Sequence, residues 1–178
     1  DETYTSSTAS ENAVLISDDA NVSMDNVTVT KTGDAKTGDE SSFYGNNSGI
    51  LAKDNADVTI SNSSIKTEAT GVNGVFSYGS SKINISASSI KTSADSSGGI
   101  MVAGGGSITA NDLTIETSGT SSAAIRSDKG GGNIVVSKGA YKTTGVGSPS
   151  IYSLVYKARC HEFTSVFSLI PRNFMVEE

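Results

Sequence analysis

Isoleucine and valine recur at a fixed spacing along most of the chain. The segment 56–67 returns at 81–92 and at 106–117, and a further copy follows at 133–143. The apolar positions form three columns, namely Val14, Ile50, Val75, Ile100, Ile125 and Ile151; Val22, Val58, Ile83, Ile108 and Ile134; and Val29, Ile65, Ile90, Ile115 and Tyr141. A fixed period of about 25 residues predicts a repeat fold, because one unit buries its apolar face only by stacking on the next.

Apolar and polar residues alternate within each copy, as in Val58-Thr59-Ile60. A period of two is typical of a strand with one buried face. Each copy holds three such short segments, separated by Gly, Asn, Ser and Asp. The sequence therefore predicts an all-β fold, a right-handed parallel β-helix with about 25 residues per coil and five to six coils. A left-handed β-helix would need six-residue units, and a leucine-rich repeat would need a recurring Leu framework.

Two segments depart from the repeat. The first copy begins at Asn21 and the second at Asp57, which is more than one period, so we expect an insertion near 33–45 within a repeat domain of residues 1–153. The tail, residues 154–178, has no Gly and holds the only Cys and the only His, Cys160 and His161. It is either a cap over the last coil, with Phe163, Phe167, Leu169 and Phe174 as its apolar lid, or a truncated or frame-altered gene end. Residues 1–4 include no initiator Met, so we expect the sequence to begin inside a longer product or after a removed signal.

The charge balance narrows the possible partners. There are 13 Lys and Arg against 19 Asp and Glu, a net charge of -6. Nucleic acids and anionic membrane surfaces attract an excess of cations, so we expect neither as a partner. No run approaches the roughly 20 apolar residues of a membrane-spanning helix, so we expect no membrane insertion. One Cys and one His build neither an internal disulfide nor a His/Cys metal cluster, and we expect no metal and no cofactor.

One outward column is apolar rather than polar. If the first column points inward, its neighbours point outward: Leu15, Leu51, Phe76, Met101, Arg126 and Tyr152, followed two residues later by Lys53, Tyr78, Ala103 and Asp128. Exposed apolar and aromatic surface marks binding or assembly sites. The candidate ligand-binding residues are therefore Leu51, Phe76, Tyr78, Met101, Arg126, Asp128 and Tyr152. The alternative is that the insertion or the tail folds over this stripe and turns it into a second small core.

A second outward column carries charge. It consists of Thr30, Lys66, Lys91, Glu116 and Lys142. We interpret it as a solvated face that discourages association of strand edges. A neighbouring hydroxyl file, Thr28, Ser64, Ser89 and Thr114, superficially suggests ice binding. Long Lys side chains two residues away argue against that use.

An enzymatic function would need clustered carboxylates, for acid and base work or for calcium. Asp18, Asp19 and Asp54 are candidates, but the column of Asp18 and Asp54 continues as Gly79 and Gly104, so no carboxylate cluster builds up. Arg126, Asp128 and Lys129 form a second charged group. The paired Asp and His motifs of polygalacturonases are absent from the sequence, and His161 lies in the aberrant tail. We therefore predict no catalytic residues.

Seven segments are informative beyond the repeat, namely residues 11–15, 27–34, 40–45, 73–79, 98–106, 123–132 and 147–153. On these segments the chain resembles the adhesin-like β-helical surface proteins of gut Firmicutes, and the resemblance covers roughly residues 3–153. It implies an extracellular or cell-wall-associated β-helix and names no ligand. The sequence thus favours a non-enzymatic adhesin that binds a host or environmental glycan or protein. A polysaccharide lyase or hydrolase of the pectate-lyase-like class and a structural spacer of a larger surface protein are the alternatives.

Overall fold

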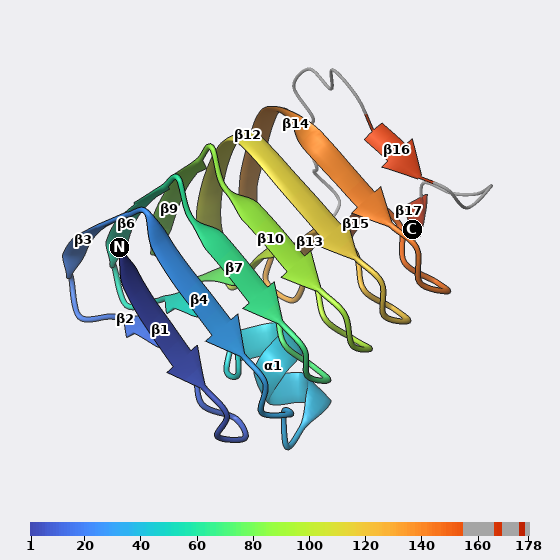
Figure 1. The fold of residues 1–178 in the computed structure, drawn as a ribbon, viewed down its shortest axis with the longest axis horizontal. Helices are drawn as coiled ribbons and strands as arrows, with labels where there is room; N and C mark the ends of the chain where they lie inside the picture. Colours follow the sequence, from blue (N-terminus) through green and yellow to red (C-terminus); the bar gives the residue numbers. More distant parts are fainter. Residues whose placement is uncertain (155–165, 169–174, 177–178) are drawn as a thin grey trace.

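The chain winds as a right-handed parallel β-solenoid of about six turns that recur about every 25 residues (Figure 1). The computed structural model describes residues 1–154, 166–168 and 175–176. Every paired strand in this part of the chain is parallel to its partner, and each partner comes from a neighbouring coil. The predicted fold class is confirmed.

Each coil contributes strands to three walls. The first wall contains β2 (Val14–Ile16), β5 (Ile50–Ala52), β8 (Val75–Tyr78), β11 (Ile100–Ala103), β13 (Ile125–Ser127), β15 (Ile151–Ser153) and β17 (Met175–Val176). The second contains β3 (Asn21–Asp25), β6 (Asp57–Ser61), β9 (Lys82–Ser86) and the first halves of β12 (Gly106–Thr117) and β14 (Gly132–Thr143). The third contains β1 (Glu2–Ser6), β4 (Val27–Lys31), β7 (Ser64–Thr67), β10 (Ser89–Thr92), the second halves of β12 and β14, and β16 (Val166–Ser168).

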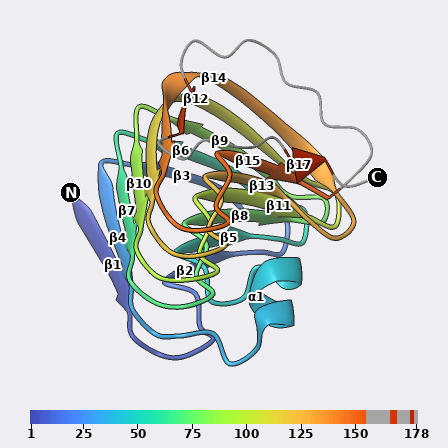
Figure 2. The same ribbon diagram turned by 90° about the vertical axis from the view of Figure 1, so that its right-hand side faces the viewer.

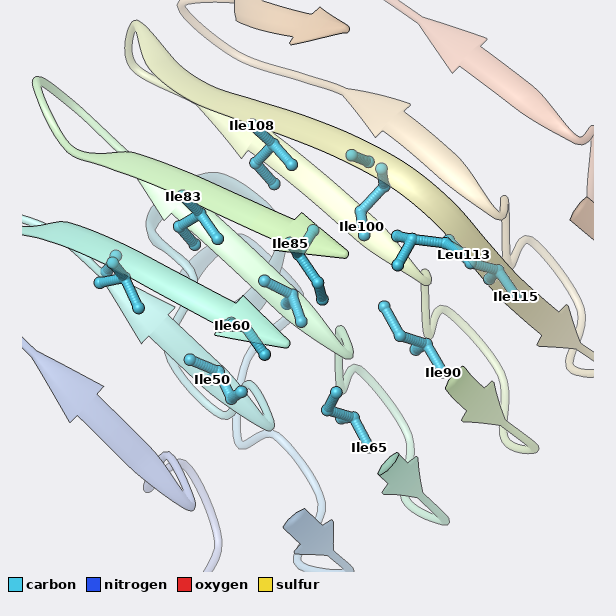
Figure 3. Packing of buried hydrophobic residues seen from close by; sticks show 14 of the residues in the cluster. Ile50, Ile60, Ile65, Ile83, Ile85, Ile90, Ile100, Ile108, Leu113 and Ile115 are labelled. Atoms are coloured by element: carbon cyan, nitrogen blue, oxygen red, sulfur yellow. The ribbon is translucent and has the colours of Figure 1, made fainter. Parts of the chain in front are cut away.

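The three predicted apolar columns are the three inner ladders of the solenoid. Ile90, for example, lies in register with Ile65 on one side and Ile115 on the other. The first and second columns pair in the same unbroken order. Figure 3 shows these side chains filling the space between the walls. Stacking buries each coil's apolar side against its neighbours, which one coil alone does not achieve.

The corner between the second and third walls needs at most two residues: one lies between β3 and β4, and two lie between β6 and β7 and between β9 and β10. At this corner the left-handed backbone conformation recurs at Asn26, Asn62, Ala87, Asp112 and Lys138, with φ between 45° and 58°. Asn and Asp adopt this conformation more readily than most residues, because their side chains bond locally to the backbone. Because the corner is short, a strand can continue through it without a break. β12 and β14 do so, and each spans two walls.

Buried serines line the corner that follows the third wall. The Ser97 amide donates to Ser122 Oγ at 3.0 Å, and the Ser122 amide donates to Ser148 Oγ at 2.8 Å. Each hydroxyl also donates to carbonyls of its own or the preceding coil. A buried amide left without a partner costs stability, so these serines stabilise turns that the sheets do not pair.

A short helix, α1 (Gly38–Tyr44), lies within the predicted insertion. Thr37 is its N-cap, and the Thr37 hydroxyl accepts a hydrogen bond from the Glu40 amide at 3.3 Å. The helix ends at Gly45, whose φ of 76° is the left-handed conformation that favours glycine. Viewed along the solenoid, α1 lies outside the coil, beside the first wall (Figure 2).

The tail contributes two strands that continue the walls. β16 pairs with β14, so that Val166 lies opposite Tyr141, and β17 pairs with β15, so that Met175 lies opposite Tyr152. Cys160, His161 and the proposed lid residues Phe163, Leu169 and Phe174 lie outside the described residues. Whether the tail is a native cap or an altered gene end stays a prediction.

Candidate functional site

The outer surface of the third wall carries two parallel files of polar side chains. Strand alternation turns every second residue of β4, β7, β10, β12 and β14 outward. One file is Thr28, Ser64, Ser89 and Thr114, and the other is Thr30, Lys66, Lys91, Glu116 and Lys142, as their register shows. Consecutive members lie one strand spacing apart, about 4.8 Å. The charged column predicted from the sequence is confirmed, and we call this surface the ladder face.

A shallow groove of about 200 Å³ runs along the C-terminal half of the ladder face. Its lining residues are Lys91, Thr92, Glu116, Thr117, Ser118, Lys142 and Thr144. They come from three consecutive coils, at the point where the strands pass into the next turn. Two backbone hydrogen bonds join the coils at the floor of the groove: the Ser118 amide donates to the Thr92 carbonyl and the Thr144 amide donates to the Thr117 carbonyl, both at 3.0 Å.

The charges of the groove are well exposed. Lys91 Nζ lies 3.8 Å from the carboxylate of Glu116, and these side chains are 63% and 46% exposed. An exposed pair at this distance contributes only about 0–1 kcal/mol, so a ligand displaces it at little cost. Lys142 lies on the other side of Glu116 in the register. Thr92 and Thr117 are buried, and their hydroxyls donate to the carbonyls of Ser97 and Ser122. Two ammonium groups, one carboxylate and the exposed hydroxyls of Ser118 and Thr144 thus offer donors and acceptors to a polar ligand.

The predicted exposed stripe is wrong for its central residues. Leu51, Phe76, Met101 and Ala103 are all buried, and Tyr78 packs against them as a separate small cluster. The insertion supplies the cover: the rings of Tyr44 and Tyr78 meet edge to face at 5.7 Å. Strand alternation decides only that these side chains lie on the outer surface of the first wall. They are buried because α1 packs on that outer surface. The alternative of a second small core is confirmed.

The far end of the stripe forms a polar cluster beside this core. The Arg126 guanidinium donates to the Asp128 carboxylate, and Arg126 also lies over the Tyr152 ring, 5.6 Å from its centroid. The side chains of Arg126 and Asp128 are only 17% and 3% exposed. Lys129 lies over the Phe43 ring of α1 at 5.2 Å. The contact between Lys129 and Phe43 joins the insertion to the solenoid. Arg126 and Asp128 offer little open surface to a ligand.

The remaining carboxylates are dispersed along the coils. Asp19 accepts a hydrogen bond from Asn55 at 3.0 Å, and Asp54 lies 3.3 Å from Lys53. Asp18 and Asp54 occupy the position that Gly79 and Gly104 occupy in the next two repeats. Among residues 1–154 and the two tail strands, no three His, Cys, Asp or Glu side chains gather as a metal site would require.

A buried lysine was not identified from the sequence. Lys31 occupies the inward position that Thr67, Thr92 and Thr117 occupy in later coils. It is fully buried, and its ammonium donates to the carbonyls of Thr8 at 2.9 Å and Gly33 at 2.7 Å. Burial lowers the pKa of Lys31, although the more distant charges of Asp34 and Glu11 partly offset the effect. Lys31 thereby joins the N-terminal turn to the start of the insertion.

Comparisons with known proteins identify no relative of this chain. No family model, no curated protein and no solved structure matches this chain. In the described part of the chain, no helix has the length and apolar character that crossing a membrane requires. A function for this chain is therefore inferred from the fold and the ladder face.

Proposed function

We propose that the protein is a non-enzymatic β-solenoid, secreted or attached to a bacterial cell wall, that binds a glycan chain along the ladder face. The carrying observation is the groove of about 200 Å³ in which Lys91 and Lys142 flank Glu116 beside the exposed side chains of Ser118 and Thr144. The extracellular location is part of the proposal and follows from the adhesin-like resemblance expected from the sequence of residues 3–153.

The geometry of a solenoid suits a polymeric ligand. The ladder face repeats a charged or polar group in five consecutive coils and a hydroxyl in the first four of them, with Ala140 at the fifth position, and the coils lie about 4.8 Å apart. A glycan chain likewise repeats hydroxyl groups along its length, so several weak hydrogen bonds form at once along the face. The open groove and exposed charges favour weak binding at each position, and affinity then grows with the number of coils that the ligand spans.

The test is to screen the full chain against an array of neutral and acidic polysaccharides. We expect binding above background, and we expect the double variant Lys91→Ala/Lys142→Ala to weaken it about tenfold, because charge-assisted hydrogen bonds are lost. Lys82→Ala is the matched control, since Lys82 is exposed on the second wall opposite Asp57. This control variant retains binding.

Three outcomes contradict the proposal. No binder above background, with intact coils by circular dichroism, would favour a structural spacer of a larger surface protein. Reproducible cleavage of pectin, alginate or another uronan would favour a lyase or hydrolase. Equal loss in the Lys82→Ala control would show that binding follows overall charge and not the ladder face.

A further inference from the structure

The coil that carries the insertion has an unusual pair of residues at the corner after the third wall. In a later coil, the inward Thr92 at the end of this wall donates through its hydroxyl to the carbonyl of Ser97 in the corner, at 2.8 Å. The register places Lys31 at the position of Thr92 and Asn47 at the position of Ser97. The insertion lies between these two residues, so the chain leaves the repeat after Lys31 and rejoins it at Asn47.

The side chains of Lys31 and Asn47 meet at the carbonyl oxygen of Gly33. Lys31 Nζ donates to this oxygen at 2.7 Å, and Asn47 Nδ2 donates to the same oxygen at 2.8 Å. Both residues are fully buried. Because the two nitrogens share one acceptor, the amine of Lys31 lies next to the side-chain amide of Asn47, in a site shielded from bulk water.

Lys31 has one proton more than the described surroundings accept. An ammonium group has three protons to donate. The carbonyls of Thr8 and Gly33 accept two hydrogen bonds from Nζ, and Lys31 takes part in none of the ion pairs between described residues. Burial lowers the pKa of Lys31. Loss of the third proton leaves an amine whose two N–H groups stay bonded and whose lone pair is free, which makes it a nucleophile.

The amide of Asn47 is held beside this amine at a cost. Its Oδ1 atom is buried and has no hydrogen-bond partner among the described residues, and a buried acceptor without a partner lowers stability. The backbone of Asn47 has a φ of 67°, the left-handed conformation that asparagine tolerates. That conformation accounts for an asparagine in the turn, but it does not account for a buried side chain with an unpaired oxygen. A nucleophile held next to the amide gives this placement a chemical role.

We propose that Lys31 and Asn47 form an intramolecular isopeptide bond. The lone pair of Lys31 Nζ attacks Cγ of Asn47, the Cγ–Nδ2 bond breaks, and Nδ2 leaves as ammonia with one proton taken from Nζ. One amide replaces another, so the step requires no oxidant or reductant. The new amide keeps one N–H group for the Gly33 carbonyl. The bond closes a covalent loop over residues 31–47, which contains α1, and thereby fixes the insertion on the solenoid.

Mass spectrometry of the intact, folded chain tests the proposal directly. We expect the wild type to be lighter than its sequence mass by one ammonia, about 17 Da. Trypsin does not cleave after an acylated lysine, so we expect a branched tryptic peptide in which residues 1–36 are joined to residues 37–53. Lys31→Met and Asn47→Ala abolish both signals. Asn46→Ala, which changes the neighbouring asparagine, is the matched control and retains them.

The wild-type measurements do not depend on whether the variants fold. A folded wild type with its full sequence mass overturns the proposal. A succinimide at Asn47, formed by attack of the backbone, also releases ammonia, but it gives no branched peptide and persists in Lys31→Met. That result overturns the proposal as well, and so does a branched peptide that is lost in Asn46→Ala as completely as in Asn47→Ala.

Discussion

Truncating one member of an inner ladder tests how much each coil contributes to stability. Ile90 is 1% exposed and lies between Ile65 and Ile115. Ile90→Ala removes three carbon atoms, which costs about 2.4 kcal/mol at about 0.8 kcal/mol for each. The cavity that remains adds to this loss, because strands held on both sides relax little. We therefore expect a total loss of about 3–4 kcal/mol, within the range of about 2–5 kcal/mol found for such changes.

The assay is urea unfolding followed by circular dichroism. Ile90→Val serves as an intermediate, with an expected loss of about 0.5–1.5 kcal/mol. Leu15→Ala is the control, because Leu15 is 53% exposed on the outer surface of the first wall, and we expect it to change stability by less than about 0.5 kcal/mol. Equal effects of the Ile90 and Leu15 variants would refute the reasoning, since the inner ladder would then contribute no more than the surface.

Two further changes probe close packing and the buried amine. Gly74→Ala places a Cβ 2.4 Å from Ile90 Cγ2 and 2.8 Å from the Gly99 carbonyl oxygen, so we expect chemical unfolding to show a loss of about 1–3 kcal/mol in the unfolding free energy. A Cβ added at Gly38 meets no atom within 4 Å, so we expect Gly38→Ala to cause no loss. Equal losses in the two variants would contradict the close packing at Gly74. The pKa of Lys31 is below 10.5 in the folded chain, so the unfolded chain binds more protons between the lowered pKa and 10.5. The difference in unfolding free energy between the wild type and Lys31→Met, measured by urea titration at several pH values on protein without the Lys31–Asn47 bond, therefore rises with pH in that window. A difference that stays flat or falls would contradict the claim that burial lowers the pKa of Lys31.

The inner ladders were predictable because their physics is local and repeated. A strand with one buried face shows a period of two, and a stack of coils repeats that pattern at a fixed interval. Val58, Ile83 and Ile108 therefore occupy the same column in the sequence and in the structure. The outward file of Lys66, Lys91 and Glu116 follows from the same alternation.

The cover over the first wall was not predictable from that pattern. Alternation places Phe76 and Met101 on the outer surface, but only the path of the insertion decides whether water or protein meets them. A local signal was present: Thr37 and Glu40 stand three residues apart, as in a capping box, and Gly45 follows as a helix stop. Those residues indicate the helix, although they do not indicate where it packs.

Lys31 was missed for a different reason. A lysine at an inward position of a strand usually argues against burial, because removing a charge from water costs free energy. Two carbonyls of irregular turns, at Thr8 and Gly33, accept hydrogen bonds from its ammonium group here. Such acceptors belong to loops whose conformation the repeat does not specify. The groove likewise depends on how three coils turn together, which no single copy of the repeat encodes.

The most direct test of coil stacking is register-specific disulfide trapping. In a Cys160→Ser background, Ser64→Cys/Ser89→Cys places two thiols at residues that pair on adjacent strands, where the two hydroxyls now lie 3.4 Å apart. Strands about 4.8 Å apart fall within the Cα separation that a disulfide tolerates. The account predicts rapid oxidation of this pair and none of the offset pair Ser64→Cys/Lys91→Cys. Equal oxidation of both pairs, or of the offset pair alone, would contradict a stack in which equivalent positions of successive repeats lie side by side.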